Sequence, residues 1–299
     1  MKKVILSISA MLFVGFAAVA QNNASLVTQS TGAFNSAGPG NNAEVGQNGD
    51  LNKSTVGQVG NNNKSIVHQG IEPSPVNATN NLAVVSQTNT DNIAKISQSN
   101  HDNQAYQTQD GKTNNATIWQ DQIVEALVNP SALGGNDKAW QTQTGNNNTA
   151  TIDQGTTGNE FPTGTASPAL GTGFSTAQIT LGLSGVNVPY SPHASNSAKQ
   201  TQSGNYNTAY ASQGGKNNIS EQTQTSASNA VGADENKSNH YQYGNDNKSY
   251  TVQDGSKHID NTLQSGNNNY ANLLQTGAAQ KSVIFQKGNS QIANVTQTN

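Results

Sequence analysis

The chain has 299 residues, of which 10% are charged and 5% aromatic, and both fractions are low for an enzyme domain of this length. It contains no cysteine, which excludes disulfides and thiolate metal sites. All fourteen basic residues are lysines and the net charge at pH 7 is −3, so binding of nucleic acid through a basic face is not expected.

Residues 1–20 are expected to form a secretory signal peptide. Two lysines precede an apolar run that extends from Val4 to Val19, and the sequence Ala18-Val19-Ala20 has the small-x-small pattern of a cleavage site. Serines within the run and the cleavage pattern distinguish this segment from a membrane span. We expect cleavage between Ala20 and Gln21. No later segment is apolar enough to cross a bilayer, so the mature chain is predicted to be exported.

From residue 21 onward the sequence repeats with a period of eleven residues. The repeat reads Gln-x-Gly-x-x-Asn-x-Ala/Ser-x-Val/Ile-x-Gln, and nineteen units align on their closing glutamine. A fixed period this short indicates stacked, equivalent turns of backbone. It argues against disorder, which the polar composition would otherwise suggest. The closing glutamines are Gln29, Gln47, Gln58, Gln69, Gln87, Gln98, Gln109, Gln120, Gln143, Gln154, Gln202, Gln213, Gln224, Gln242, Gln253, Gln264, Gln275, Gln286 and Gln297.

Four positions of each unit alternate along seven residues, which places Asn, Ala/Ser, Val/Ile and Gln on one face of a β-strand. We expect this face to point inward and the intervening residues, such as Asp153, to face solvent. Eighteen of nineteen units carry Ala or Ser four places before the glutamine, and the exception is Asp260. The asparagines expected to stack on one another are Asn52, Asn63, Asn92, Asn103, Asn114, Asn148, Asn207, Asn218, Asn247 and Asn269.

The other four residues of each unit must reverse the chain. Glycine stands two places after the glutamine in eleven units, and Asn takes this place at Asn89, Asn100 and Asn299. Gly and Asn accept positive φ most readily, so the position is predicted to be a left-handed turn. These turn glycines are Gly49, Gly60, Gly111, Gly145, Gly204, Gly215, Gly244, Gly255, Gly266, Gly277 and Gly288.

Five intervals between glutamines are longer than eleven residues. The insertions lie near residues 30–40, 70–80, 121–135, 155–195 and 225–235, and they contain all eight prolines. Each falls between a closing glutamine and the next Asn position, where the turn lies, so the strands are spared. If successive units alternate between two sheets, the first and last insertions leave one edge and the other three leave the opposite edge.

Together these elements predict an all-β fold for residues 21–299. It is a β-solenoid of strand-turn-strand rungs with about 22 residues per rung, in which two parallel, in-register sheets face each other. Stacked rungs would place Gln above Gln and Asn above Asn at about 4.7–4.8 Å, where amide side chains hydrogen-bond into ladders. Such ladders would satisfy buried amides, each of which costs about 1–3 kcal/mol when left without a partner.

The repeat resembles the curlin repeat, Ser-x5-Gln-x-Gly-x2-Asn-x-Ala-x3-Gln. The segment Gln58-Val-Gly60-Asn-Asn-Asn63-Lys-Ser65-Ile-Val-His-Gln69 and the segment that begins at Gln202 match it closely. The resemblance implies a secreted structural subunit that self-assembles into curli-like amyloid fibres on the cell surface, for adhesion and biofilm matrix. It also implies three partners besides the chain itself: a curli nucleator, an outer-membrane secretion pore and a periplasmic chaperone.

Two features depart from the family pattern. The chain has more units and longer insertions than typical curli subunits, which leaves open the alternative of a minor, nucleating subunit of the same fibre. The stretch Gln21–Gly40 lacks the glycine-rich targeting segment expected after the signal.

Other functions have weaker support in the sequence. An ice- or surface-binding β-solenoid adhesin needs a regular outward threonine column, but the position three before the glutamine varies through Tyr106, Thr117 and Trp140. No carboxylates or histidines cluster, so we expect no catalytic residue, metal or cofactor. Asp260, the one charge in its column, is predicted to slow assembly by repulsion between stacked charges.

Overall fold

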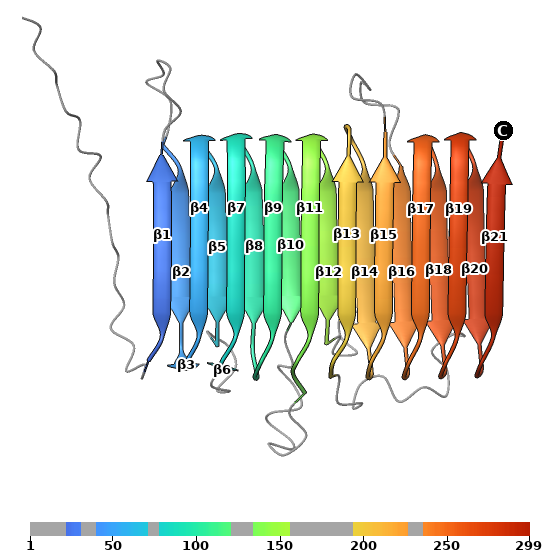
Figure 1. Ribbon diagram of the computed structural model, residues 1–299, viewed down its shortest axis with the longest axis horizontal. Coiled ribbons are helices and arrows are strands. Elements are labelled where there is room, and N and C mark those ends of the chain that lie inside the picture. Colours follow the sequence, from blue (N-terminus) through green and yellow to red (C-terminus); the bar gives the residue numbers. More distant parts are fainter. Residues whose placement is uncertain (1–21, 31–39, 71–77, 121–133, 156–193, 227–235) are drawn as a thin grey trace, which may run out of the picture.

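The computed structural model describes residues 22–30, 40–70, 78–120, 134–155, 194–226 and 236–299, which form one stack of strands (Figure 1). The predicted signal peptide and its cleavage between Ala20 and Gln21 lie outside the described residues. So do most of the five predicted insertions.

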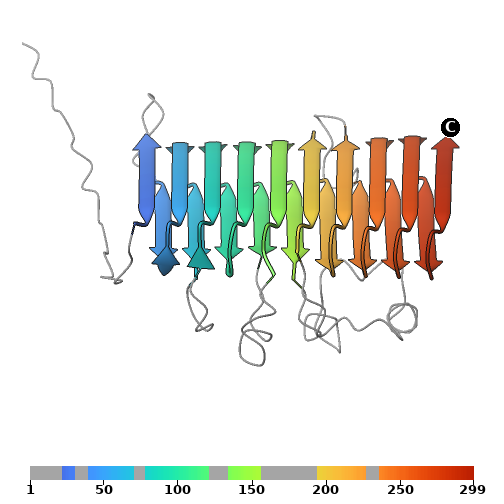
Figure 2. The ribbon, with the colours of Figure 1, turned by 60° about the horizontal axis from the view of Figure 1, so that its bottom comes forward.

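Successive repeat units alternate between two parallel sheets that lie face to face (Figure 2). We call the ten-stranded sheet "sheet A" and the nine-stranded sheet "sheet B". The strands of sheet A are β1 (Ala24–Ser30), β4 (Lys53–Asn61), β7 (Leu82–Thr90), β9 (Gln104–Lys112), β11 (Lys138–Asn146), β13 (Ser197–Ser203), β15 (Ile219–Thr225), β17 (Lys248–Ser256), β19 (Tyr270–Ala278) and β21 (Ile292–Thr298). The strands of sheet B are β2 (Asn42–Gln47), β5 (Lys64–Gln69), β8 (Ile93–Gln98), β10 (Asn115–Gln120), β12 (Thr149–Gln154), β14 (Thr208–Gly214), β16 (Lys237–Tyr243), β18 (Ile259–Ser265) and β20 (Lys281–Lys287).

Every strand pairs in register with the strand two units away, as the sequence predicts. Gln87 lies opposite Gln109, 22 residues later, and Gln143 lies opposite Gln202, 59 residues later. The insertions therefore change the length of a connection but not the register. The predicted β-solenoid with two facing parallel sheets is confirmed.

The strands also show where the insertions leave the stack. β1 and β15, which precede the insertions near residues 30–40 and 225–235, belong to sheet A, whereas β5, β10 and β12 belong to sheet B. The strands of the two sheets run in opposite directions (Figure 1). The described strands that precede the two groups of insertions therefore end at opposite edges of the stack.

One connection is more regular than predicted. Residues 78–80 were expected to belong to a loop, but β6 (Ala78–Thr79) pairs in parallel with β3 (Gly49–Asp50). Single bridges continue this pairing from Thr79 to His101 and on to Gly135. The turns at one edge thus pair between rungs as the strands do.

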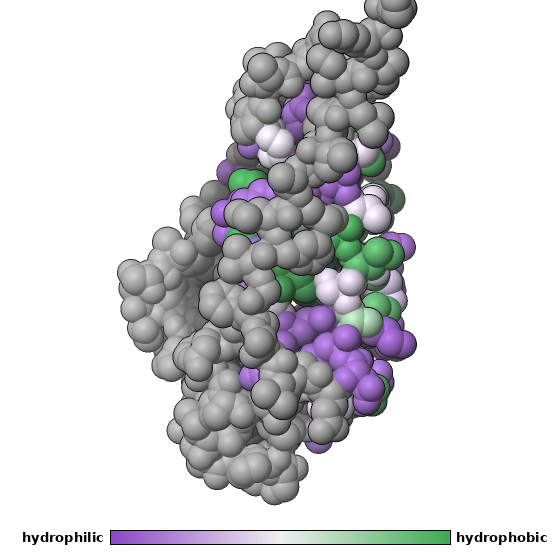
Figure 3. Space-filling model, turned by 90° about the vertical axis from the view of Figure 1, so that its left-hand side faces the viewer, coloured by the Kyte–Doolittle hydropathy of each residue, from purple (hydrophilic) through white to green (hydrophobic). Residues whose placement is uncertain are grey.

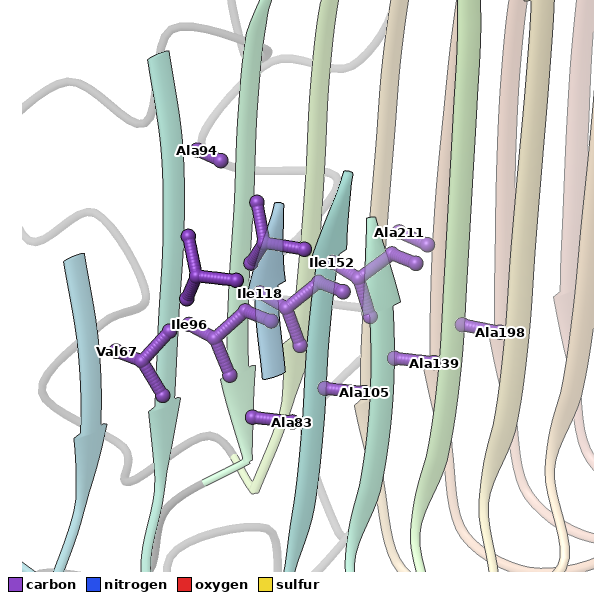
Figure 4. Packing of buried hydrophobic residues seen from close by; sticks show 12 residues of the cluster. Val67, Ala83, Ala94, Ile96, Ala105, Ile118, Ala139, Ile152, Ala198 and Ala211 are labelled. Carbon is purple, nitrogen blue, oxygen red and sulfur yellow. The ribbon is translucent and has the colours of Figure 1, made fainter. Parts of the chain in front are cut away.

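Small and branched apolar side chains fill part of the space between the sheets. Figure 4 shows alanines such as Ala139 and Ala198 opposite larger residues such as Ile118 and Ile152, all within one buried cluster. Short alanine side chains let the two backbones approach, and the isoleucines fill the gap that remains. The core is therefore a thin layer that extends along the stack.

The turns contain two columns of left-handed residues. All eleven predicted turn glycines have positive φ, between 93° at Gly204 and 137° at Gly111. A second column was not predicted. The residue just before the Asn position also has positive φ, near 57–59° even at Lys257, Thr113 and Tyr206. Its signal in the sequence was an excess of Asn and Asp, which tolerate this conformation.

Replacing Gly145 with alanine is expected to lower the free energy of unfolding by about 1–3 kcal/mol. Gly145 has φ 109°, and an added Cβ would collide with the backbone oxygen of Gly204 in the next rung. The matched control is Gly57→Ala, whose Cβ would meet Thr28 Oγ1 at an ordinary 3.6 Å. Denaturant unfolding of both variants tests this difference, and equal midpoints would contradict it.

Candidate functional site

The closing glutamines form two unbroken hydrogen-bonded ladders. In sheet A each Nε2 donates to Oε1 of the glutamine in the following rung at 2.6–2.9 Å, from Gln29 to Gln297. In sheet B the same bonds run from Gln47 to Gln286 at 2.8–2.9 Å. Every bond points the same way along the stack, so each ladder has a donor end and an acceptor end.

From Gln47 onward each closing glutamine also links the two sheets, which the sequence did not reveal. Gln143 Nε2 donates to Asn115 O of the facing strand at 3.1 Å, and Gln154 Nε2 donates to Lys138 O at 3.0 Å. The side chain thus uses both N–H groups and its oxygen. Glutamate has no N–H donor and leucine has neither group, so only a primary amide of this length satisfies the site.

The asparagine column works differently from the predicted amide-to-amide ladder. The side-chain oxygen mainly accepts a hydrogen bond from a backbone N–H of the following rung. For example, Asn148 Oδ1 accepts a bond of 3.0 Å from the backbone N–H of Asn207. Its Nδ2 donates to turn carbonyls, as Asn148 does to Gly204 O at 2.8 Å. Direct bonds between asparagine amides occur only in some rungs, such as Asn207 to Asn148 at 3.1 Å. These side chains therefore hold the turns in place, because a short amide reaches the backbone beside it.

Two residues that replace Asn in this column, Asp137 and His258, still provide a side-chain hydrogen-bond acceptor for the following rung. Asp137 Oδ1 accepts the N–H of Asn196 at 2.8 Å, and His258 Nδ1 lies 3.4 Å from the N–H of Gln280. What the column requires is an acceptor for the next rung, and Asp supplies that as well as Asn.

A second, shorter glutamine ladder lies where Val or Ile was expected. Gln107, Gln141, Gln200 and Gln222 occupy the position two before the closing glutamine on four successive strands of sheet A. Their side chains bond in series at 2.9 Å, and all are 1% exposed. In sheet A this position is therefore polar in the middle of the stack and apolar toward both ends, whereas the facing strands of sheet B carry Ile118 and Ile152 there.

Asp260 lies where this polar segment ends, and its surroundings contradict the predicted repulsion between stacked charges. Its column neighbours are Ser238 and Ser282. Its carboxylate accepts hydrogen bonds from Thr251 at 2.6 Å and from Ser238 at 3.1 Å, and it lies 3.2 Å from Nε2 of His240. Asp260 and His240 are both 0% exposed. The carboxylate is part of a buried polar cluster and faces no like charge there.

The same cluster contains the residue types of a hydrolase triad. Ser220 Oγ lies 2.9 Å from Nδ1 of His240, whose other ring nitrogen faces Asp260. A nucleophile must reach a substrate, and all three side chains are fully buried between the sheets. We therefore assign the cluster a structural role.

Part of the outer face of sheet B is buried, contrary to prediction. Asp153 was expected to face solvent but is 1% exposed, and outward-facing Tyr241 and Tyr243 are 3% and 0% exposed. Tyr243 shares a hydrogen bond of 3.1 Å with Ser212, and burial is the main cause that raises its pKa well above the ordinary value. The rings of Tyr210 and Tyr241 adjoin on this face, with centroids 5.5 Å apart.

Charged groups in the turns pair locally. A hydrogen bond of 2.6 Å from Asn80 lowers the pKa of Asp102, and His101, 2.9 Å from the carboxylate, lowers it further. Within the described ranges, no three His, Asp or Glu side chains gather closely enough to hold a metal ion. None of the described segments contains a helix long and apolar enough to span a membrane.

The two ends of the stack present open strand edges. Among the described strands, β1 pairs only with β4, β2 with β5, β20 with β18, and β21 with β19. Outward-facing residues direct their N–H toward the following rung, as Tyr270 does to Gln291 O at 2.8 Å. By the same alternation, the N–H groups of outward-facing residues on β21 point away from the stack. An edge of this kind pairs readily with another strand.

A comparison with family models finds the curlin associated repeat at residues 38–70 and 266–298. The first match covers the region of β2 to β5 and the second covers β19 to β21. No curated protein matches the chain. The matched repeats therefore include strands at both ends of the stack.

Proposed function

Because this chain is a curlin-repeat protein, we propose that it is a secreted structural subunit that polymerises head to tail into curli-like amyloid fibres at the cell surface. Adhesion and a contribution to the biofilm matrix would follow from such fibres. The open strand edges at the two ends of the stack favour another copy of this chain as the binding partner. The nucleator, secretion pore and chaperone remain expectations from the family resemblance.

The direction of the glutamine ladders carries this proposal. At one end Gln286 and Gln297 receive bonds from Gln264 and Gln275, and no described strand provides a following rung for their own Nε2 groups. At the other end Gln29 and Gln47 donate to the next rung, and their Oε1 atoms lack a preceding one. Donors thus meet acceptors only when the ends of two copies meet head to tail.

Proline at Thr296 is expected to abolish most fibre growth while leaving the subunit folded. Thr296 faces outward on β21, so its N–H points toward the open edge, and proline cannot donate there. The measurement is dye-binding growth together with circular dichroism, with Thr296→Ala as the matched control. Growth of Thr296→Pro at the rate of the control would count against assembly through this edge.

One observation favours the alternative of a surface-binding solenoid. Thr108, Thr142, Thr201 and Thr223 form an outward column on four successive strands of sheet A. The neighbouring outward column is uneven, because it contains Trp140 and charged residues. We rank this function second, and a chain that stays monomeric in the growth experiment would favour it.

A further inference from the structure

We propose that successive subunits in the fibre are related by a half turn about the stack axis, so that sheet A of one copy continues as sheet B of the next. This inference rests on the proposed head-to-tail assembly and adds the geometry of its interface. The half turn follows from the unequal number of strands in the two sheets.

Among the described strands, the first and the last both belong to sheet A. The ten-stranded sheet begins at β1 and ends at β21, whereas the nine-stranded sheet begins at β2 and ends at β20. If a second copy were simply translated, its β1 would pair with β21. Its β2 would then lie two strand spacings from β20. One strand would be missing from sheet B at every junction.

A missing strand is costly in this fold. The facing edges of β20 and of the second copy's β2 would expose unpaired N–H and C=O groups within an otherwise continuous sheet. Each of these groups that water does not reach costs about 1–3 kcal/mol. A translated stack would therefore carry a repeated defect.

A half turn removes the defect without changing any strand direction. The strands of the two sheets run in opposite directions (Figure 1), so rotation by half a turn about the long axis exchanges the sheets and keeps neighbouring strands parallel. Successive units within the chain already have this relation, because each lies in the opposite sheet from the last. Each unit is rotated by half a turn from the one before it, so nineteen units, an odd number, add up to a net rotation of half a turn.

The inward side chains match across the junction that results. The second copy's β1 follows β20 in sheet B, which places its Gln29 after Gln286 and its Val27 after Ile284. The second copy's β2 follows β21 in sheet A, which places its Gln47 after Gln297. Both glutamine ladders and the apolar column then continue without interruption.

The outward side chains distinguish the two arrangements. Leu26 on β1 is 59% exposed, and the half turn places it beside Val283 on β20, which is 45% exposed. Phe285, 39% exposed, lies two residues along the same strand. A translated copy would instead place Leu26 beside the polar Asn294 of β21. Figure 3 shows apolar surface at the end of the stack where β1 lies.

An unsatisfied atom at the other end points to the same arrangement. In the turns, the side-chain oxygen at the Asn position accepts the N–H of the following rung, as Asn269 does from Gln291 at 3.0 Å. Gln280 holds this position before β20, and its Oε1 is buried without a hydrogen-bond partner among the described residues. The half turn makes Asn23 of the second copy the residue that follows Gln280. Translation places Asn23 after Gln291.

Engineered cysteine pairs test the geometry, because the chain has no native cysteine. Neighbouring strands lie about 4.7–4.9 Å apart, within the Cα separation that a disulfide spans. The variant Leu26→Cys with Val283→Cys is expected to convert fibres into a ladder of covalent multimers on oxidation. The matched control is Leu26→Cys with Asn294→Cys, which should remain monomeric on a denaturing gel.

The outcomes separate this inference from the proposed function. Fibres that cross-link through the Asn294→Cys variant, through both variants or through neither would overturn the half turn and leave head-to-tail assembly intact. An unmodified chain that forms no fibres would overturn the proposed function itself.

Helical reconstruction of unmodified fibres gives a second measurement, which does not depend on the variants. We expect a rotation near half a turn and a rise of about 45 Å per copy, for nine and a half rungs. No rotation with a rise of about 48 Å, for ten rungs, would overturn the inference.

Discussion

Replacing Asp260 with alanine is expected to lower the free energy of unfolding by about 1–3 kcal/mol for each buried donor that loses its acceptor. The carboxylate is fully buried. It accepts hydrogen bonds from the hydroxyl groups of Thr251 and Ser238, and it faces Nε2 of His240. Alanine would remove this acceptor from a fully buried site, where only Thr251 Oγ1 and His240 Nε2, 2.8 Å apart, keep each other as partners. Slower fibre growth should accompany the lost stability, whereas repulsion between stacked charges would require faster growth.

Denaturant unfolding measures the effect, with Asp254→Ala as the matched control because Asp254 is exposed on β17 of the same region. A second variant tests whether the pair acts as a unit. His240→Ile combined with Asp260→Ala puts residue types common in these two columns at both positions. The double variant should lose less stability than the sum of the two single changes. Additive losses, or a stable Asp260→Ala variant, would show that the pair is not coupled.

The second large effect is expected at Gln143, in the middle of the sheet A ladder. Leucine there would remove three buried hydrogen bonds: the bond from Gln109 Nε2, which keeps only its bond to Ile93 O, the bond to Gln202 Oε1 and the bond to Asn115 O. At about 1–3 kcal/mol for each group, the total is at least about 3 kcal/mol. Leucine also has greater apolar surface than glutamine, so the loss would be due to hydrogen bonding and not to reduced burial.

Gln104→Leu on the neighbouring strand β9 is the matched control, because Gln104 faces outward and is half-buried. Both variants are compared by their denaturant midpoints and by the concentration at which fibres form. Gln143→Glu should also destabilise, since glutamate keeps the acceptor for Gln109 but has no donor for Gln202 or Asn115. If Gln143→Leu unfolds at the same midpoint as Gln104→Leu, the ladder contributes no net stability.

Residues that repeat in phase could be predicted from the sequence. The place of Gln143 above Gln202, and the positive φ of Gly145, follow from the eleven-residue period alone, because stacking copies one rung onto the next. Side-chain partners outside a column could not be predicted in this way. The bond from Gln143 to Asn115 O depends on how far apart the two sheets lie, which no period encodes.

The sequence by itself determined the strands, the register, the turn glycines and the alternation between two sheets, because all of these follow from a short period and from alternating side-chain chemistry. Only the tertiary structure decided which positions of facing strands meet. It placed His240 of β16 against Asp260 of β18 and Thr251 of β17, and it buried Asp153 on a face expected to be solvated. The physical reason is that a repeat specifies contacts along the stack, whereas contacts across it depend on the distance between two sheets and on residues that do not repeat.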